Sequence, residues 1–374
     1  MMKEGWTYKK LGEVCEILDS RRKPITKSKR ESGSIPYYGA TGLLDYVKDY
    51  IFDEKLVLLG EDGAKWGAGE NSSYIIEGKT WVNNHAHTLR PKRDVLIDEF
   101  LVYYLNYSNL LPYITGVTVP KLNQEKMRSI EIPIGSLNKQ RSIISRLDAA
   151  FADIDALKAN ADKQLSEARQ LFQAELTECM KLKEGWKEKK IKEVGEVIGG
   201  TTPSTNNPEF WGGDICWISP AELHGEHYLY DSVKKITQKA VIAKSLKELP
   251  IGTVILSSRA PIGKLAINKV PMYCNQGFKC IACGPELYNE FLYWWLYGNT
   301  DYLNSIGTGA TFPEISKAVV ENIVIPVAPL DTQHQIVDRL DSLSSRIKQL
   351  EEVQRKTMAE CNALKQALLR EIFE

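Results

Sequence analysis

Apolar residues recur at heptad spacing along two long segments of the chain, residues 138–182 and 331–374, and neither segment contains glycine or proline. The apolar positions of the first segment are Leu147, Ala150, Phe151, Ile154, Leu157, Ala161, Ala168 and Leu171. Those of the second are Leu340, Leu343, Ile347, Leu350, Met358, Cys361, Leu364 and Leu368, with charged residues on the other faces. The spacing predicts two coiled-coil helices, each about 60 Å long at about 1.5 Å per residue.

The sequence around these helices is duplicated. Gly5-Trp6 and Glu13-Val14 recur at Gly185-Trp186 and Glu193-Val194. Residues 130–148 and 323–341 agree at 9 of 19 positions, including an Ile-x-Ile-Pro sequence that leads into Leu-x-x-Gln. Two unrelated helix starts would not agree to this extent, so the chain is a tandem duplication. It divides into a first module at 1–137, a helix at 138–182, a second module at 183–330 and a helix at 331–374.

Short apolar runs separated by glycine turns fill both modules. Leu56–Leu59 and Thr253–Leu256 are examples, and they predict strands. We therefore expect an α+β fold of two mixed α/β modules with antiparallel strand pairing. If a two-fold axis relates the repeats, the two helices run antiparallel with one module at each end. Residues 18–95 and 198–285 share this pattern but few polar identities, which favours two related modules that read different targets.

Charge is balanced overall, with 48 basic and 48 acidic residues, so the net charge gives no indication of a polyanionic partner. Locally, six basic residues and no acidic one lie between Arg21 and Arg30, which is typical either of a solvated loop or of a phosphate-contacting loop. No signal peptide or long apolar span is found, so we expect a cytoplasmic protein.

Motifs for catalysis and metal binding are incomplete. Residues 60–67 are rich in glycine but lack the Gly-Lys-Ser/Thr ending of a phosphate-binding loop. The Asn207-Pro208-Glu209-Phe210 sequence lacks the second proline of the amino-methyltransferase motif. His85 and His87 could ligate a metal, but no further ligand is close in sequence, so hydrogen bonding or packing is favoured. The sequence therefore predicts neither catalytic residues nor a metal site.

Polar side chains on loops at strand ends remain as candidates for DNA contact, because such side chains bond base edges and phosphates. In the first module the candidates are Arg21, Arg22, Lys23, Glu61, Asn83, Asn84 and His87. In the second module they are Thr201, Thr202, Ser258, Arg259, Lys264 and Gln276.

The arrangement of these motifs resembles the specificity subunit of type I restriction-modification enzymes. Each module opens with a Gly-Trp segment leading to Glu-Val and closes with Ile-x-Ile-Pro and a Leu-x-x-Gln helix start. The resemblance covers nearly the whole chain. It implies two target recognition domains, each reading half of a bipartite DNA site, and an antiparallel coiled coil that sets the gap between the half-sites.

The resemblance also implies partners. The coiled coil would dock two methyltransferase subunits, and restriction subunits would join through those. S-adenosylmethionine, Mg²⁺ and ATP would belong to the partners, and this chain would be non-catalytic. Two alternatives stay open: the same role in a methylation-only complex, and a coiled-coil scaffold whose modules bind protein, which the neutral net charge permits.

Overall fold

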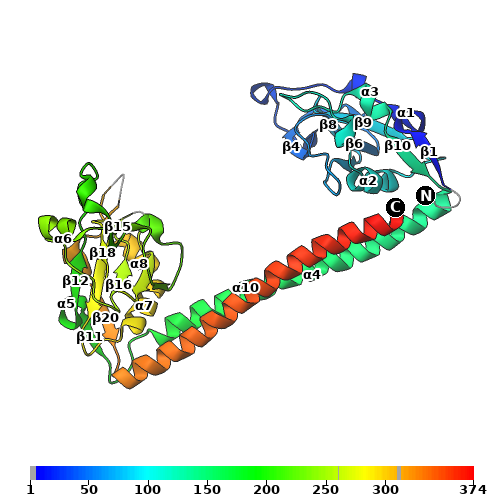
Figure 1. Cartoon of the computed structure of the whole chain (residues 1–374). Helices are drawn as coiled ribbons and strands as arrows, with labels where there is room; N and C mark the ends of the chain where they lie inside the picture. Colours follow the sequence, from blue (N-terminus) through cyan, green and yellow to red (C-terminus); the bar gives the residue numbers. More distant parts are fainter. Residues whose placement is uncertain (1–5, 260, 310–312) are drawn as a thin grey trace. The chain divides into compact units, whose positions relative to one another are not determined.

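The computed structural model describes residues 6–259, 261–309 and 313–374, which form two compact units (Figure 1). Unit 1 comprises residues up to 162 together with 354–374, and unit 2 comprises residues 163–353. Each unit contains one module and parts of both long helices. The two long helices predicted from the heptad spacing are confirmed as α4 (Leu137–Cys179) and α10 (Leu330–Phe373).

The first module is built on two four-stranded sheets. Its strands are β1 (Thr7–Lys10), β2 (Cys15–Ile17), β3 (Ile35–Gly39), β4 (Gly42–Val47), β5 (Phe52–Asp53), β6 (Leu56–Gly60), β7 (Ser73–Ile76), β8 (Lys79–Val82), β9 (Ala86–Pro91) and β10 (Glu131–Ile134). Its helices are α1 (Leu11–Val14), α2 (Asp98–Tyr107) and α3 (Gln124–Arg128). The strand orders are β2-β9-β6-β7 and β4-β3-β8-β5, and β1 pairs with β10.

The second module repeats this plan with additions. Its strands are β11 (Lys187–Lys190), β12 (Gly195–Gly199), β13 (Trp211–Ile218), β14 (Tyr228–Leu229), β15 (Lys234–Ile236), β16 (Val254–Leu256), β17 (Leu265–Asn268), β18 (Tyr273–Cys274), β19 (Lys279–Cys283) and β20 (Val324–Val327). Its helices are α5 (Ile191–Val194), α6 (Gln238–Lys244), α7 (Asn289–Gly298), α8 (Thr300–Ser305) and α9 (Lys317–Glu321). The strand orders are β12-β19-β16-β17-β14 and β15-β13-β18, and β11 pairs with β20.

Most strand pairs are antiparallel, as predicted, but three are parallel. They are β3 with β8, β13 with β18, and β14 with β17. The expectation of antiparallel pairing is therefore confirmed for most strand pairs and wrong for these three. Long connections separate the members of each parallel pair, so the chain returns to the same sheet edge before it enters the second strand.

The glutamine of each Leu-x-x-Gln motif fixes a long helix to its module. Gln140 is fully buried, its Oε1 accepts from Ile97 N at 3.0 Å, and its Nε2 donates to the carbonyl oxygens of Val95 and Gly135 at 2.8 and 3.0 Å. Gln333 repeats the arrangement with Tyr288 N at 2.8 Å and with two carbonyl oxygens, of Glu286 at 2.9 Å and Ala328 at 2.7 Å. One side chain thus satisfies three backbone groups that a helix start and a loop leave without partners.

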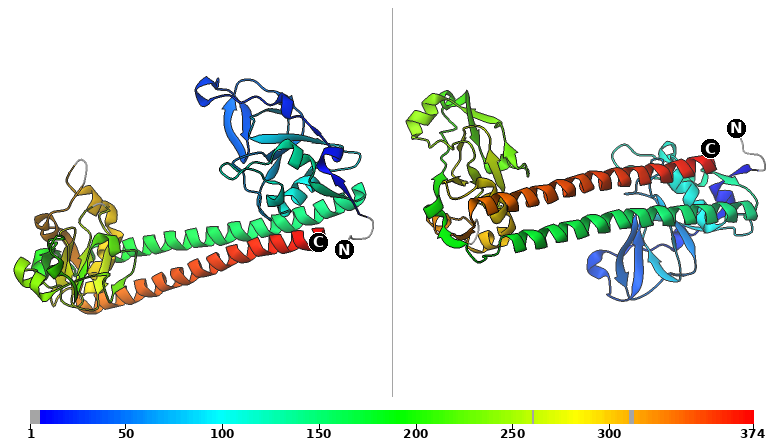
Figure 2. Two further views of the ribbon diagram at one scale, coloured as in Figure 1. Left: turned by 45° about the horizontal axis from the view of Figure 1, so that its top comes forward. Right: turned by 90° about the horizontal axis from the view of Figure 1, so that it is seen from below.

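The long helices run antiparallel within each unit (Figures 1 and 2). In unit 1, Arg146 pairs with Glu371 at 2.8 Å and Asp155 with Lys365 at 2.7 Å. In unit 2, Arg169 pairs with Glu351 at 2.7 Å, and Glu175 with Arg339 at 2.8 Å. Along α4 the residue number rises while that of its α10 partner falls, which confirms the antiparallel pairing.

The predicted apolar seam is only partly buried. Leu147 and Ile154 are buried, whereas Leu157, Leu171 and Leu364 are 56%, 72% and 49% exposed. The seam prediction was wrong for these three leucines. An α-helix has 3.6 residues per turn, so positions spaced for a 3.5-residue repeat drift off the contact face. Within the described residues, no helix has both the length and the apolar character that crossing a membrane requires.

Candidate nucleic-acid interface

Three loops meet at one end of the β2-β9-β6-β7 sheet of the first module. Gly60, at the end of β6, lies opposite Ala86, at the start of β9. Just before β9, the Asn83 Oδ1 accepts a hydrogen bond from His85 N at 2.8 Å and so closes a tight turn. The backbone N–H of Leu122 donates to the carbonyl of Glu61 at 2.8 Å, which brings the segment 115–122 to the same edge. We call this edge rim 1.

The second module builds the same backbone frame, which we call rim 2. Ser257 lies opposite Phe278, and the Asn275 Oδ1 accepts from Gly277 N at 2.9 Å. The N–H of Ile315 donates to the carbonyl of Ser258 at 2.9 Å. The same hydrogen bonds occur in both rims, so each residue of rim 1 has a structural equivalent in rim 2. Asn83 corresponds to Asn275, Asp62 to Arg259, His87 to Lys279, and Lys121 to Glu314.

The side chains on this common frame have opposite charge order. In rim 1, Asp62 forms a backbone bridge to Lys121, and the Lys121 Nζ lies 4.0 Å from Asp62 Oδ2 and 2.7 Å from Glu61 Oε1. In rim 2, Arg259 forms the equivalent bridge to Glu314, and its Nε lies 2.9 Å from Glu314 Oε2. In rim 1 the acidic Asp62 is bridged to the basic Lys121, whereas in rim 2 the basic Arg259 is bridged to the acidic Glu314. The two rims therefore offer different hydrogen-bonding groups from one scaffold.

A buried ionic network lies directly beneath rim 1. The guanidinium of Arg22 is 2.5 Å from Glu61 Oε2, 3.4 Å from Asp19 Oδ2 and 2.7 Å from the Ala86 carbonyl oxygen. Only 12% of the Arg22 side chain is exposed. Direct DNA contact by Arg22 and Glu61 stays a prediction. Their contacts give both residues a structural role in holding β9 to the loop before β3.

His87 sits between two hydrogen-bond acceptors in this network. Its Nδ1 is 2.6 Å from Asp19 Oδ2 and its Nε2 is 2.7 Å from the carbonyl oxygen of Leu122. Only an imidazolium, with a proton on both nitrogens, can donate to both acceptors at once. Burial raises the pKa of Asp19, but hydrogen bonds from His87, Thr88 and Gln124 outweigh it and hold that pKa below its usual value. DNA contact by His87 stays a prediction, and its side chain is 1% exposed.

Asp19, Glu61 and His87 offer ligand atoms within 4.8 Å of one another, a spacing that could suit a metal ion. Both carboxylates already have protein cations as partners. Burial raises the pKa of Glu61, but hydrogen bonds from Lys121 and Arg22 and the charge of His87 outweigh this effect and lower it below its usual value. Charge neutralisation within the cluster supports a salt-bridge network here rather than a metal centre.

The arginines of the basic loop contact other residues of the module, whereas its lysines are exposed to solvent. Arg21 donates to the Ile51 carbonyl at 2.9 Å and lies 4.6 Å over the Phe52 ring, and Arg30 pairs with Asp45 at 2.9 Å. By contrast, three lysines are exposed, and their side chains form no hydrogen bond or ion pair among the described residues: Lys23, Lys27 and Lys29. The exposed lysines fit both interpretations left open by the sequence, a solvated loop and a phosphate-contacting loop, so DNA contact by Lys23 stays a prediction, and the contacts of Arg21 and Arg30 stabilise the loop itself.

The remaining candidates are distributed over the two rims. Asn84 and Gln276 are exposed at corresponding positions, and Asn83 is buried by its turn. Thr202 Oγ1 donates to Gln276 Oε1 at 2.5 Å, and Thr201 is exposed beside it. Ser258 is fully buried, and its Oγ accepts from Lys279 at 3.1 Å. The Nζ of Lys264 donates to the carbonyl oxygens of Pro220 and Leu223, so this lysine is used within the module.

Sequence reasoning missed four rim residues, Asp62, Lys121, Lys279 and Glu314, and it considered His85 for metal ligation, hydrogen bonding or packing but not as a DNA-contact candidate. The Asp62 Oδ1 lies 2.5 Å from His85 Nδ1, which orients the exposed imidazole of His85. Alignment of the turn at 115–123 with the turn at 308–316 makes Lys121 and Glu314 equivalent positions with opposite charges, and that contrast could have identified both residues. The other two, Asp62 and Lys279, follow only from the sheet register.

The fold defines a protein of two related modules, each packed in its own unit with antiparallel segments of two long helices. Residues 3–167 and 183–360 match the family described as the type I restriction modification DNA specificity domain. The chain therefore belongs to this family, and the resemblance inferred from its motifs is confirmed.

Individual relatives agree with this assignment. The chain is 41% identical over 191 residues to the MjaIX specificity subunit of Methanocaldococcus jannaschii, an alignment that spans 49% of this chain and only 44% of that relative. It is 29% identical over 354 residues to a putative specificity subunit of Haemophilus influenzae, spanning 90% of this chain and 87% of that protein.

Two solved structures share the fold across the whole chain. One is a chain from a type I R-M system described for its complex assembly and conformational transition, with a TM-score of 0.75, 19% identity, and coverage of 100% of this chain and 99% of that one. The other is the HsdS subunit of Thermoanaerobacter tengcongensis, with a TM-score of 0.63, 20% identity, and coverage of 100% and 97%.

Proposed function

We propose that this chain is the DNA-targeting subunit of a type I restriction-modification complex, in which each module reads one half of a bipartite DNA site. The observation that carries the proposal is the reversed charge order on a shared frame, Asp62 opposite Lys121 in rim 1 and Arg259 opposite Glu314 in rim 2. Base edges in the major groove differ in their pattern of donors and acceptors. Two rims with the same backbone hydrogen bonds but different side chains would therefore recognise two different half-sites.

Phosphate contacts would come from the lysines of the basic loop. Lys23, Lys27 and Lys29 are exposed on the first module, and their side chains form no hydrogen bond or ion pair among the described residues. Such contacts fix orientation on the duplex without reading its sequence, whereas side chains on the rim would supply the reading.

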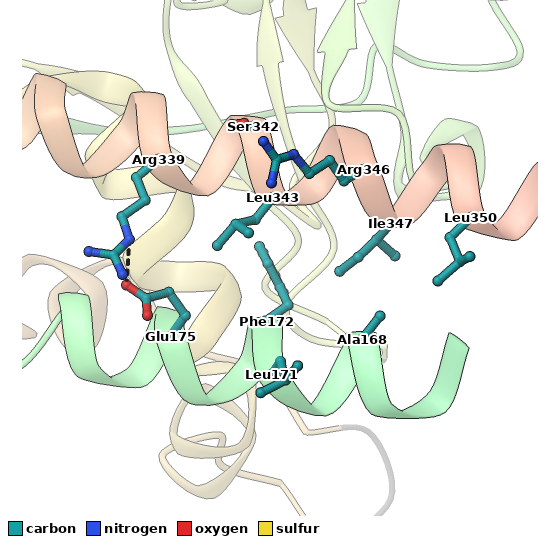
Figure 3. Close-up of a pocket in the computed structure, with 10 residues that line it drawn as sticks. All are labelled: Ala168, Leu171, Phe172, Glu175, Arg339, Ser342, Leu343, Arg346, Ile347 and Leu350. Carbon is teal, nitrogen blue, oxygen red and sulfur yellow. Dashed lines mark ion pairs between the residues drawn. The ribbon is translucent and has the colours of Figure 1, made fainter. Parts of the chain in front are cut away.

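Two methyltransferase subunits would dock on the paired helices. Leu171 in unit 2 and Leu364 in unit 1 are both exposed, and they lie 193 residues apart (364 − 171), the offset that also relates Ile130 to Ile323. Two equivalent exposed leucines would give two equivalent docking positions. In unit 2, Leu171 borders an apolar groove of about 560 Å³ between α4 and α10, lined also by Phe172, Leu343 and Ile347 (Figure 3).

The chemistry would reside in the partners. In this proposal the chain is non-catalytic, and restriction subunits join through the methyltransferases. S-adenosylmethionine, Mg²⁺ and ATP would be bound by those partners. The ionic network beneath rim 1 has a structural explanation in its own cations, which supports a role in recognition rather than catalysis.

Modified-base sequencing tests this function directly. DNA from a cell that carries this chain with its neighbouring methyltransferase subunit is compared with DNA from the same cell lacking this chain. We expect a split methylated motif that disappears without the chain. Exchange of residues 18–130 for the corresponding segment of a relative should change only one half of the motif.

Two results would contradict the proposal. One is a methylation pattern that does not depend on this chain in an active system, and it would favour the protein-binding scaffold. The other is a module exchange that alters both halves or neither. Cleavage of unmethylated DNA by the assembled complex would separate a restriction system from a methylation-only one.

A further inference from the structure

Arg259 is held in a fixed orientation at rim 2, three residues after the last residue of β16, Leu256. Its Nε donates to Glu314 Oε2 at 2.9 Å, and 49% of the side chain is exposed. Among the described residues, the two terminal nitrogens of this guanidinium have no partner. Because a guanidinium is planar, one bond at Nε orients the whole fork and leaves its outer N–H groups available.

Glu314 is itself fixed by a second cation. The Nζ of Lys279 lies 3.3 Å from Glu314 Oε1, and Lys279 is held by the Ser258 hydroxyl at 3.1 Å and the Gln276 carbonyl at 3.2 Å. Only 11% of the Lys279 side chain is exposed. Burial raises the pKa of Glu314, but hydrogen bonds from Arg259 and Lys279 outweigh this effect and hold it below its usual value. Glu314 is therefore an anion at neutral pH.

We propose that the terminal nitrogens of Arg259 read O6 and N7 of one guanine in the half-site of the second module, with Glu314 and Lys279 as positioning residues. This inference rests on the proposed function of the chain. A guanine presents two adjacent acceptors in the major groove, which match two outward N–H donors. Adenine keeps the N7 acceptor but presents a donor at the corresponding exocyclic position, so one N–H of the fork would face another donor.

Rim 1 cannot read a base in this way at the same position. Asp62 occupies the place of Arg259, and its carboxylate is an acceptor that already orients His85. A guanine read by a bidentate arginine is therefore expected at this position for the second module only.

The experiment uses the chain assembled with its methyltransferase subunits and a duplex carrying the methylated motif. 7-Deazaguanine, which replaces N7 with C–H, is placed in turn at each guanine of the half-site assigned to the second module by module exchange. Affinity is compared for the wild type, Arg259→Ala, Arg259→Lys and Glu314→Gln. Lys244→Ala is the matched control because it removes one exposed positive charge from the same module.

We expect one 7-deazaguanine position to weaken wild-type binding about tenfold, since one of the two base contacts is lost. Arg259→Ala should weaken binding of unmodified DNA about 10- to 100-fold, and the modified base should weaken it no further. Arg259→Lys should relax preference at that base pair although it keeps the charge. Glu314→Gln should relax it partially, and Lys244→Ala should leave the preference unchanged.

Several results would overturn the inference. Uniform loss of affinity for cognate and mismatched duplexes in Arg259→Ala would identify a phosphate contact instead. Unchanged reading of every base pair by both Arg259 variants would also refute it. If Arg259→Ala did not fold, the 7-deazaguanine series with the wild type would still test the inference. Unchanged wild-type affinity at every substituted guanine would refute it. The absence of a split motif, by contrast, would refute the proposed function itself.

Discussion

Replacing Gln333 with alanine should loosen unit 2 at the start of α10. The side chain is fully buried and bonds three backbone groups, the N–H of Tyr288 and the carbonyls of Glu286 and Ala328. Alanine would leave all three without a partner. Each unsatisfied buried group costs about 1–3 kcal/mol, and entry of water into the vacated space would offset part of the sum. We expect a loss of about 2–5 kcal/mol in the stability of unit 2.

Native-state hydrogen exchange is the suitable assay, because two units need not unfold in one transition. Exchange should accelerate in α7 and β16, while unit 1 keeps its protection. Gln335→Ala is the matched control: this glutamine is exposed two residues further along α10, so its loss should change stability by at most about 0.5 kcal/mol. Gln140→Ala should produce the mirror result, with faster exchange in α2 of unit 1.

Equal protection in Gln333→Ala and Gln335→Ala would refute this reasoning. It would mean that the three backbone groups find water at no net cost. Loss of protection in both units from Gln333→Ala alone would equally contradict it, since the contacts of Gln333 lie within unit 2.

Two further predictions concern the first module. Changing Lys23, Lys27 and Lys29 together to Gln should reduce the slope of log affinity against log salt by about 2.7, at about 0.9 for each lost phosphate contact, and leave the methylated motif unaltered; a changed motif would place these lysines at bases instead. Asp19→Asn should cost unit 1 about 3 kcal/mol at pH 7, because it removes the buried carboxylate that pairs with the Arg22 guanidinium and accepts hydrogen bonds from Thr88 N and Gln124 Nε2. The folded pKa of Asp19 is lowered, so its stabilisation is present above the unfolded pKa of about 3.9 and is lost as pH falls through the folded pKa. Hydrogen exchange at pH 7 and pH 3 should therefore show a difference between wild type and variant that shrinks in acid, and a difference independent of pH would contradict the ionic role.

Sequence alone determined the large-scale organisation of this protein. Heptad spacing predicted both long helices, and the repeated Leu-x-x-Gln motif marked where each helix leaves its module. These features are readable because periodicity and repetition are properties of residues close together in the chain. The heptad pattern did not identify the exposed Leu171 and Leu364, since the helix drifts away from a strict 3.5-residue repeat.

Tertiary structure decided which candidate side chains are available to a ligand. Arg22 and Lys23 are neighbours of similar charge, yet one is nearly buried against Glu61 and the other is exposed. Their difference depends on Asp19 and His87, which lie 68 residues apart in the sequence and 2.6 Å apart in space. Burial and ion pairing depend on groups brought together by the sheet register, and no local pattern contains that information.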